Sequence, residues 1–312
     1  MRVVVLGSYV HAHCLTVPVL PMSGASIQAT DCWHGHGGKG LNLAVGMHRL
    51  GLEVCLLLAI GKDSAGKAIH SFLATEGVNT KHVLTLGEQS GFGIGLIGAD
   101  GQNVIAIYAG ANSLLADVHI ATLEEDVQQS DLICAQFEIR QPVILSAFHL
   151  AKRYQLTTML NPSPWETPSP ELLALTDILI LNESEAACMF EFEGDGSLSV
   201  EAWCEIALEL YWQGELLIIT LAERGAILFQ RGQAPLHVPA WSVKPVDPTG
   251  AGDAFAAGFA YALLTQGQYP QATRFANACG ALLTQQRGVL DALPFLSAVE
   301  VFMQQNHWPH LV

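Results

Sequence analysis

Charged residues are scarce in this chain, and basic residues are the scarcest. Asp, Glu, Lys and Arg make up 14% of the 312 residues, and 29 acidic residues outnumber 14 basic ones, which gives a net charge of −15. General nucleic-acid binding needs a basic face, so we expect no nucleic-acid partner. The negative field also repels anions, so an anionic substrate would have to be held by local amide groups and metal ions.

Long apolar runs and a disulfide framework are lacking as well. The longest apolar stretches, Leu52–Ile60 and Ala254–Leu264, fall short of the roughly 18 to 20 residues that span a bilayer, so we expect no membrane partner. Met1–Gly7 is too short for a signal peptide and is interpreted as a buried strand. The seven cysteines are odd in number and scattered, which favours a location in the reducing cytoplasm.

Half of the residues are apolar, and they follow an α/β pattern. Short β-branched runs alternate with longer helical segments, as in parallel-sheet proteins. Strands are predicted at Arg2–Leu6, Val54–Ala59, Leu132–Ala135, Thr157–Leu160, Ile178–Leu181, Leu216–Thr220 and Ala226–Gln230. Helices are predicted near Gly40–Leu50, Gly66–Glu76, Gln141–Arg153, Ser184–Phe190, Val200–Trp212, Ala254–Gln266, Tyr269–Thr284 and Pro294–Gln305.

Two stretches interrupt this alternation. Val10–Trp33 and Gly91–Tyr108 have extended hairpin patterns with no helix inside them. Two such insertions can pair into a small sheet that covers one edge of the main one. We therefore predict a single α/β domain over residues 1–312, with a doubly wound, mostly parallel central sheet flanked by helices and a small β-sheet lid formed by about residues 9–36 and 91–110.

The most informative motif is the run Asp247-Pro-Thr-Gly-Ala-Gly-Asp-Ala-Phe255. The apolar stretch after it predicts a buried helix, so Gly250, Ala251 and Gly252 would form the turn that enters the helix. Free backbone N–H groups and the helix dipole make such a turn a phosphate site. Asp253 beside it is suited to take the proton of an attacking hydroxyl. A glycine turn with an Asp cap explains the motif equally well when it is taken alone.

A second glycine cluster, Gly37-Gly38-Lys39-Gly40-Leu41-Asn42, precedes another helical segment. Glycines at a helix start let the backbone approach a ligand, and Lys39 and Asn42 supply hydrogen-bond donors for hydroxyls or phosphate. The spacing fits neither a Walker A loop nor a dinucleotide-binding fingerprint. Taken alone, the cluster is explained by an ordinary structural turn.

Together the two clusters resemble the signatures of the ribokinase-like (PfkB) carbohydrate kinases, and the resemblance runs nearly end to end. Gly37–Gly51 is similar to the first signature and Asp247–Ala262 to the second. Further similar segments, in the same order along the chain, are Gln102–Asn112, Leu160–Pro164, Asn182–Glu185 and Thr220–Gly225. The resemblance implies a ribokinase-like fold and transfer of the γ-phosphoryl group of ATP, with Mg²⁺, to a primary hydroxyl of a sugar or sugar-like acceptor.

The resemblance also implies roles for particular residues. Asp253 would be the general base, and Gly250, Ala251 and Gly252 would supply amides to the transferring phosphoryl group. Positions that match acceptor contacts are Gly38, Lys39, Asn42 and Glu138. Positions that match nucleotide contacts are Asn182, Thr220, Gly225 and Asn277.

Two metal sites are implied in the same way. Asn182 and Glu185 match an element that organises Mg²⁺ through water, although an Asn cap with Glu three residues later is also a common helix start. Asp247 and Thr249, with carbonyls near Thr284 and Gly288, match a loop for a monovalent cation such as K⁺. Lids of this kind often pair between two protomers, so we expect a homodimer formed through the lid.

The chain departs from the family pattern at the acceptor. Ribokinases read the sugar with an Asn-x-Asp pair after the first strand, and Val10 and Ala12 occupy those positions here. Neither side chain can hydrogen-bond a hydroxyl, which predicts an altered acceptor. Ala222, where the family often has Gly, is a smaller departure in the nucleotide loop.

The predicted lid is rich in His and Cys. Alternate residues of a strand share a face, so His11 and His13 form one set, and Cys32, His34 and His36 form another. Three interpretations remain open: contacts to the acceptor (His11 is the candidate) or to a second subunit, a transition-metal site, and ordinary lid surface. No spacing typical of zinc ligands distinguishes them.

Three alternatives to a sugar kinase of the ribokinase type remain. A nucleoside or fructose kinase of the same family would keep the same chemistry. A non-catalytic sugar or nucleotide sensor on the same scaffold would explain the missing Asn-x-Asp pair. An NAD-binding oxidoreductase is disfavoured because no G-x-G-x-x-G follows the first strand.

Overall fold

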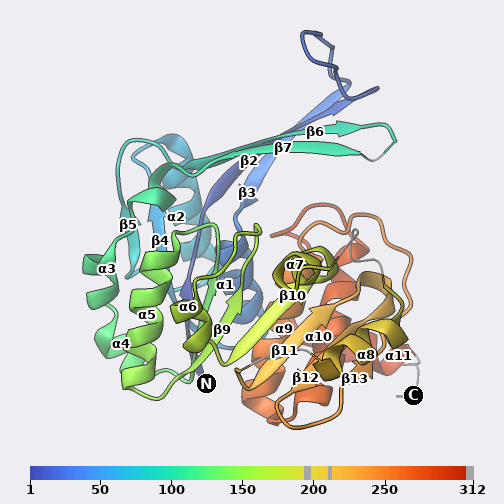
Figure 1. Ribbon diagram of the computed structural model, residues 1–312. Helices are drawn as coiled ribbons and strands as arrows, with labels where there is room; N and C mark the ends of the chain where they lie inside the picture. The colour runs from blue at the N-terminus through green and yellow to red at the C-terminus, as the bar shows by residue number, and fades with distance from the viewer. Residues whose placement is uncertain (101, 193–197, 210–212, 307–312) are drawn as a thin grey trace.

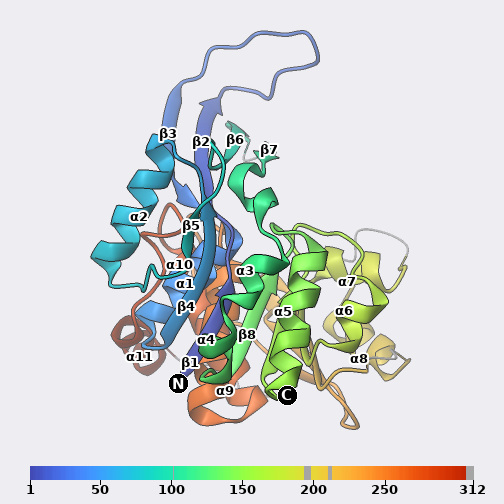
Figure 2. The same cartoon turned by 90° about the vertical axis from the view of Figure 1, so that its left-hand side faces the viewer.

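A nine-stranded sheet forms the centre of the molecule (Figures 1 and 2). The computed structural model describes residues 1–100, 102–192, 198–209 and 213–306. In spatial order the strands are β13 (Leu236–Val238), β12 (Ala226–Gln230), β11 (Leu216–Thr220), β10 (Ile178–Asn182), β9 (Thr157–Asn161), β8 (Leu132–Gln136), β1 (Arg2–Leu6), β4 (Glu53–Ile60) and β5 (Val83–Thr85). All neighbours are parallel except the pairs β11–β12 and β12–β13, which are antiparallel.

Helices cover both faces of this sheet, as a doubly wound fold requires. One face packs against α1 (Lys39–Arg49), α2 (Ser64–Glu76), α9 (Ala251–Gln266), α10 (Tyr269–Thr284) and α11 (Leu296–Gln305). The other face packs against α3 (Asp117–Ala121), α4 (Glu124–Gln128), α5 (Gln141–Arg153), α6 (Pro170–Ala174), α7 (Glu183–Met189) and α8 (Val200–Glu209). The four residues of β1 after Arg2 are apolar because both faces of the strand are covered: Val3 and Val5 enter one core, while Val4 and Leu6 enter the other.

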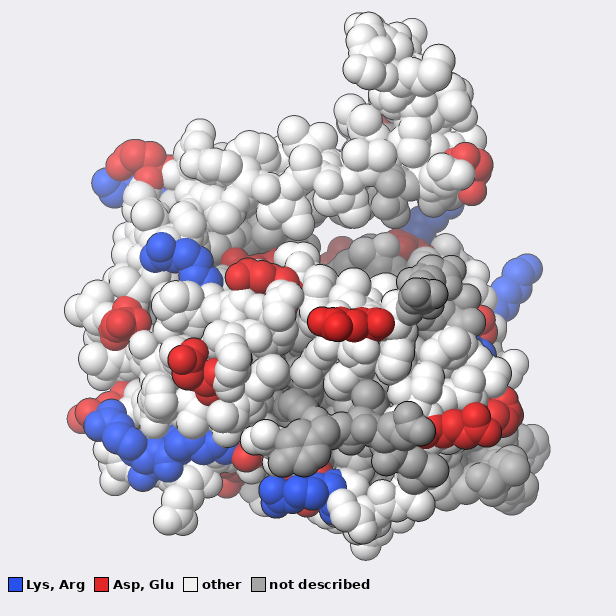
Figure 3. All heavy atoms as spheres, in the orientation of Figure 1, with Lys and Arg blue, Asp and Glu red and all other residues white. Residues whose placement is uncertain are grey.

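A separate four-stranded sheet stands above this body and is called the lid here (Figure 1). Its spatial order is β3 (Asp31–Gly37), β2 (Val10–Val17), β6 (Gly91–Gly98) and β7 (Asn103–Tyr108). Strands β2 and β6 are parallel, and the two outer pairs are antiparallel. The space-filling view shows a hollow between the lid and the body, and the lid surface in that view carries little charge (Figure 3).

The predicted architecture is confirmed, with differences at short elements and at helix ends. Strands β5 and β13 and helices α3, α4 and α6, of three to five residues each, were not predicted. Helix α9 begins at Ala251, three residues before the predicted start, and α11 begins at Leu296 rather than Pro294. Residues 210–212 of the predicted helix Val200–Trp212 lie outside the described residues. None of the described helices is long and apolar enough to cross a membrane.

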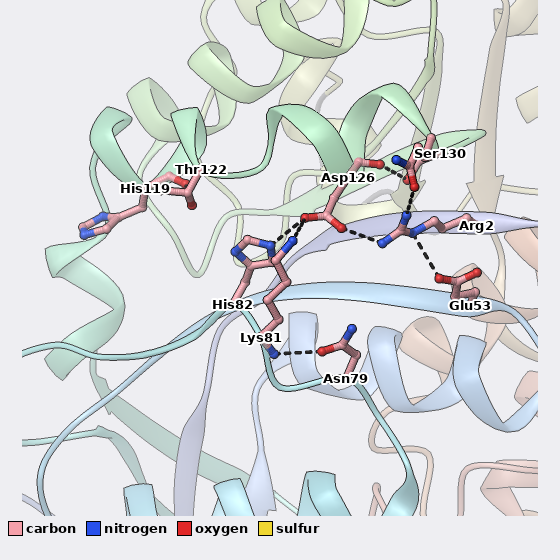
Figure 4. Close-up of polar contacts among 10 residues, drawn as sticks. Arg2, Glu53, Asn79, Lys81, His82, His119, Thr122, Asp126 and Ser130 are labelled. Atoms are coloured by element: carbon pink, nitrogen blue, oxygen red, sulfur yellow. Dashed lines mark hydrogen bonds and ion pairs between the residues drawn. The ribbon is translucent and has the colours of Figure 1, made fainter.

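A charge cluster around Asp126 ties α4 to the edge of the main sheet (Figure 4). Asp126 Oδ1 lies 2.5 Å from Arg2 Nη2, and Oδ2 lies 2.9 Å from Lys81 Nζ and 2.7 Å from His82 Nε2. Burial alone would raise the pKa of Asp126, but the hydrogen bonds and charges of Lys81 and His82 hold it below its usual range. The cluster joins segments more than forty residues apart, so it supports the fold rather than one helix.

We predict that Asp126→Asn lowers the free energy of unfolding by about 2 kcal/mol, less than for a fully buried pair because Lys81 is half exposed. A carboxylate whose pKa is depressed by folding stabilises above its unfolded pKa, and this stabilisation is lost as pH falls through the folded pKa. In urea unfolding at several pH values, the free energy of unfolding should therefore fall less for the variant than for the native protein as the pH is lowered into the acid range. Glu88→Gln, which removes an exposed pair with Lys62, is the control and should change little.

The turn after β11 holds Ala222 in the left-handed region, with φ +51°. A residue with a Cβ atom pays about 1–2 kcal/mol in that conformation, whereas glycine adopts it freely. We predict that Ala222→Gly raises the free energy of unfolding by up to about 1 kcal/mol. Ala234→Gly, in an exposed loop without a positive φ, should lower it. Equal destabilisation of both variants in urea would contradict the assignment of strain.

Candidate active site

The carboxyl ends of β1, β8, β10 and β11 meet at one edge of the sheet, where open α/β sheets bind ligands. Asn182 and Thr220 are the last residues of β10 and β11, and the segments after β1 and β8 bring Ser8 and Glu138 to the same edge. Asn182 and Thr220 are direct partners in the β10–β11 register. In Figure 1 the lid extends above the side of the body where α7 and α9 lie. These four residues, from distant parts of the chain, therefore lie along one edge of the sheet.

The glycine cluster before α1 is held tightly against the end of β1. A Cβ atom on Gly38 would lie 2.4 Å from the Ser8 carbonyl oxygen, and one on Gly40 would lie 2.3 Å from the Gly7 Cα. Gly38 also has φ +111°, which side chains rarely adopt. The glycines are thus required for close approach to the chain's own backbone at Gly7 and Ser8, as in the structural turn that the sequence left open, while approach to a ligand stays a prediction. The approach lets the backbone amide of Lys39 point at Glu138.

Glu138 is held at the centre of this loop. Its Oε2 accepts hydrogen bonds from Ser8 Oγ at 2.6 Å and from the Lys39 amide at 2.8 Å, and Ser8 Oγ in turn accepts from the Gly40 amide at 3.2 Å. Burial raises the pKa of Glu138, against the opposing effect of these hydrogen bonds. Ser8 was not predicted, because a Gly-Ser pair after a strand is too common to indicate a role. The structure assigns it the positioning of Glu138.

Asp253 lies in the first turn of α9, buried against α1. Its Oδ2 accepts a hydrogen bond of 2.7 Å from Asn42 Nδ2, although the two residues are 211 positions apart. Burial raises the pKa of Asp253, while the charge of Lys39 and the bond from Asn42 lower it, and the net direction is upward. A carboxylate with a raised pKa is a stronger base, as proton abstraction requires.

The amide of Asn42 is only half satisfied. Its Nδ2 donates to Asp253, but its buried Oδ1 has no hydrogen-bond partner in the structure. Such atoms are rare among the described residues, so this one needs an explanation. A ligand hydroxyl is a suitable donor, because it could donate to Oδ1 of Asn42 or to Asp253 beside it. The polar pair is thus arranged to receive a hydroxyl group.

The start of α9 has the geometry of an anion site. Gly250 is the residue before the helix, with φ +81°, and a Cβ atom there would lie 2.4 Å from Val289 Cγ1. The Ala251 amide donates to the Pro248 carbonyl at 3.1 Å, so it is less available than predicted. The amides of Gly250 and Gly252 have no such bond among the described residues, and a Cβ atom on Gly252 would meet open space. They are the amides best able to hold a phosphate.

Asn182 and Glu185 form a reciprocal cap at the start of α7. Asn182 Oδ1 accepts from the Glu185 amide at 2.8 Å, and Glu185 Oε2 accepts from the Asn182 amide at 2.9 Å. The capping interpretation is therefore confirmed. It leaves Oε1 of the buried Glu185 without a recorded partner, which is compatible with binding Mg²⁺ through water. The predicted metal role stays a prediction.

The predicted monovalent-cation loop is assembled by hydrogen bonds of its own. Asp247 Oδ1 accepts from the Thr249 amide at 3.0 Å, and Oδ2 accepts from the Gly288 amide at 3.3 Å. The Thr284 carbonyl accepts from two amides, those of Val246 and Asp247. Both of its lone pairs are used, so Thr284 does not fit a cation ligand in this arrangement. The remaining candidates are Asp247, Thr249 and Gly288.

The predicted nucleotide contacts lie at the ends of β10 and β11, in the turn after β11 and on α10. Gly225 has φ +96°, and a Cβ atom there would lie 2.2 Å from the Val238 carbonyl oxygen. Asn277 Nδ2 donates to the Val238 and Pro239 carbonyls, both at 3.1 Å. Both hydrogens of this amide are therefore used in holding α10 to β13, which leaves Oδ1 for a ligand. Thr220 Oγ1 donates to the Leu181 carbonyl at 3.3 Å.

Val10 and Ala12 lie on the side of the chain that faces the site. The amide and carbonyl of Tyr9 pair with the side chain of Asn112, which holds Tyr9 extended. Ser8, Val10 and Ala12 therefore point one way, and Ser8 reaches Glu138. This face of the lid is called the inner face here. His11, the predicted acceptor contact, lies on the opposite or outer face, where its ring contacts are with other histidines.

Comparison with known proteins agrees with this site. Residues 2–296 match the family model described as pfkB family carbohydrate kinase. The chain is 32% identical over 293 residues to the ribokinase of Haemophilus influenzae, covering 93% of this chain and 94% of that one.

Solved structures show the same fold. The crystal structure of ribokinase from Thermotoga maritima has a TM-score of 0.85 at 27% identity, covering 97% of this chain and 99% of that one. The ribokinase of Arabidopsis thaliana, solved in complex with ribose and ATP, has a TM-score of 0.84 at 27% identity, covering 96% and 98%. The chain therefore belongs to the pfkB family of carbohydrate kinases and is an ATP-dependent carbohydrate kinase.

Proposed function

We propose that this kinase phosphorylates a primary hydroxyl of a sugar or sugar-like acceptor, with Asp253 as the general base. The observation that carries the proposal is the pair formed by Asp253, whose pKa is raised by burial, and Asn42, whose Oδ1 is buried without a donor. An acceptor hydroxyl would donate its single hydrogen to Asp253, and a neighbouring hydroxyl of the same acceptor would donate to Oδ1 of Asn42. The Arabidopsis relative solved with ribose and ATP supports the same substrate classes.

The reaction is a direct in-line transfer. Asp253 takes the proton of the acceptor hydroxyl while the oxygen of that hydroxyl forms a bond to the γ-phosphorus. The bond from the γ-phosphorus to the β–γ bridging oxygen breaks, and ADP is released. The free amides of Gly250 and Gly252 orient the transferring group and stabilise its equatorial oxygens. Glu138, fixed by Ser8 and the Lys39 amide, is placed to accept another acceptor hydroxyl.

The metal and nucleotide roles follow from the same residues. Glu185 and Asn182 would hold Mg²⁺ through water, and the ion when bound neutralises charge on the phosphate oxygens. Thr220, Gly225 and the Oδ1 of Asn277 would contact the nucleotide. Asp247, Thr249 and the Gly288 carbonyl would hold K⁺ beside the anion site. Reducing conditions suit the described cysteines, all of which are free, and support a cytoplasmic location.

The lid supports a homodimer as the working form. Val104, Ile105, Ile107 and Tyr108, all on β7, expose between 52% and 61% of their surface. Strand β7 is also an edge of the lid sheet, with unpaired backbone groups. Pairing two lids would cover both the apolar side chains and this edge.

We expect Asp253→Asn to lower the kinase rate about 100- to 10,000-fold while ATP binding is kept. Because burial raises the pKa of Asp253, the native rate should fall as pH falls through that raised pKa, since a protonated carboxyl cannot accept the hydroxyl proton. The residual rate of Asp253→Asn should not show this fall at low pH. ADP release across a panel of pentoses, hexoses and nucleosides measures the rate, and calorimetry measures ATP binding.

Asp117→Asn, at an exposed carboxylate on α3, is the matched control and should keep the native rate. Equal background rates for native protein and Asp253→Asn over the whole panel would instead support the non-catalytic sensor. A native rate that survives in Asp253→Asn would remove the general-base role and leave the kinase family unaffected.

Acceptor choice is predicted to depend on the inner face of the lid. Val10, Ala12 and Gly93 offer no side-chain hydrogen bond there, so an acceptor with an apolar or deoxy group towards the lid is favoured over ribose. We predict that the double change Val10→Asn and Ala12→Asp lowers KM for D-ribose at least about tenfold, because each restored hydrogen bond contributes about 1 kcal/mol or more. An unchanged KM with an unchanged fold would show that acceptor choice lies elsewhere.

A further inference from the structure

The outer face of the lid carries a cluster of four histidines, His11, His13, His34 and His36. In the β2–β3 register His11 lies opposite His36, and His13 lies opposite His34, so all four share one face. No motif of the proposed reaction uses them, since the inner face of the same strand carries Val10 and Ala12. The sequence predicted two separate same-face sets, His11 with His13, and Cys32 with His34 and His36. Only the pairing of β2 with β3 joins the histidines of both sets into one cluster.

The four rings centre on His11. Its ring centroid lies 4.4 Å from that of His13, 5.9 Å from that of His34 and 6.0 Å from that of His36, and His13 and His34 are 6.4 Å apart. Imidazoles bound to one tetrahedral ion have centroids about 5 Å apart, because each metal–nitrogen bond is about 2 Å long. The measured separations lie around this value, so the rings are near enough to reach one ion after rotation about their χ angles.

The hydrogen bonds of Tyr9 indicate which nitrogen of His36 is free. Tyr9 Oη lies 2.9 Å from His36 Nδ1 and donates its single hydrogen to the Ala65 carbonyl at 3.2 Å. With the tyrosine hydrogen on the Ala65 carbonyl, Nδ1 of His36 is assigned as the donor to the tyrosine oxygen. In the neutral ring Nε2 then keeps an unshared lone pair. Metal-bound histidines are oriented in this way, by a partner on the other ring nitrogen.

The surroundings favour an added cation. The carboxylates of Asp63, near His11, and Asp291, near His36, add negative charge.

We propose that His11, His13, His34 and His36 form a binding site for a divalent transition-metal ion, represented by Zn²⁺, on the outer face of the lid. Imidazole ligands select zinc, nickel and copper over magnesium, so the site is chemically distinct from the Mg²⁺ site of the reaction. The ion would clamp β2 to β3 and, through His36 and Tyr9, to the start of α2. In this structure no three of the ring nitrogens lie within 4.8 Å of one another, so binding turns some rings about their χ angles.

A second group, Cys55, His82 and Asp126, does meet that distance among the described residues. There the carboxylate already pairs with Arg2, Lys81 and His82, and a further cation would be repelled by them. We therefore assign the metal to the lid and use the Asp126 group as the alternative that the experiment must exclude.

The test is a zinc titration of chelator-treated, full-length protein without nucleotide, with Mg²⁺ in excess to fill oxygen-rich sites. One Zn²⁺ per chain is expected by calorimetry, and Co²⁺ should give the visible absorption of a tetrahedral site. His13→Ala and His34→Ala should each weaken binding at least about tenfold, and Tyr9→Phe about 10- to 100-fold. His149→Ala, at an exposed histidine on α5, and Cys32→Ser, one row further out on the lid, should bind as the native protein does.

Absence of zinc binding to the native protein would overturn the proposal. So would native affinity in the double variant His13→Ala, His34→Ala, which would place the ion at another site such as that of Asp126. Variants that change the oligomeric state without changing the zinc affinity would show that the histidines are subunit contacts. That result would also contradict the proposal. Native unfolding midpoints and native kinase rates with MgATP show that the variants are folded.

Discussion

The placement of Asp253 depends on how closely α1 and α9 pack. A Cβ atom on Gly46 would lie 2.9 Å from the Cβ of Ala257, so the two helices approach more closely than larger side chains allow. Asn42 and Asp253 each lie four residues before these small residues, on the same helix faces. The contact of Gly46 with Ala257 therefore also sets the hydrogen bond between Asn42 and Asp253. A larger residue at position 46 would move the base away from its partner.

The electrostatics of the site follow from burial. Asp253 and Glu138 are both removed from water, and burial is the largest cause of the rise in each pKa. A protein with a net charge of −15 would repel a nucleotide at long range, so the attraction must be local. Backbone amides at the start of α9 can supply it. The charge of Lys39 lowers the pKa of Asp253, but burial outweighs this effect, so Asp253 stays a stronger base than an exposed aspartate.

Much of the fold and the site could be predicted from the sequence, because the signals are local. Strands such as Leu132–Gln136 are apolar over their first four residues, and the glycines at positions 38, 40 and 250 mark turns that only glycine can form. Strands of three residues, such as Val83–Thr85, are too short to show a period. The engagement of the Ala251 amide and of the Thr284 carbonyl depends on loop geometry, which residue types do not determine.

Features that arise from pairing between distant segments could not be predicted. The Asp126 cluster and the role of Ser8 each join residues far apart in the sequence. The histidines of the lid could be assigned to strand faces, but only the β2–β3 register places His11 opposite His36. A shift of one residue in that register would have put Gly35 or Gly37 opposite His11 and moved the histidines of β3 to the inner face. Strand pairing therefore keeps the imidazoles away from the acceptor side of the lid.

The alternation along β2 separates two chemical properties on one thin sheet. Residues on the inner face, such as Val10 and Ala12, cannot bind a metal or a hydroxyl, whereas the histidines of the outer face can bind both. If the imidazoles faced inward, they would lie near the phosphate groups and compete with Asp253 for protons. Placed outward, a bound ion can affect the reaction only through the rigidity of β2 and β3. The lid can thus be altered on its outer face without a change in the groups that carry out phosphoryl transfer.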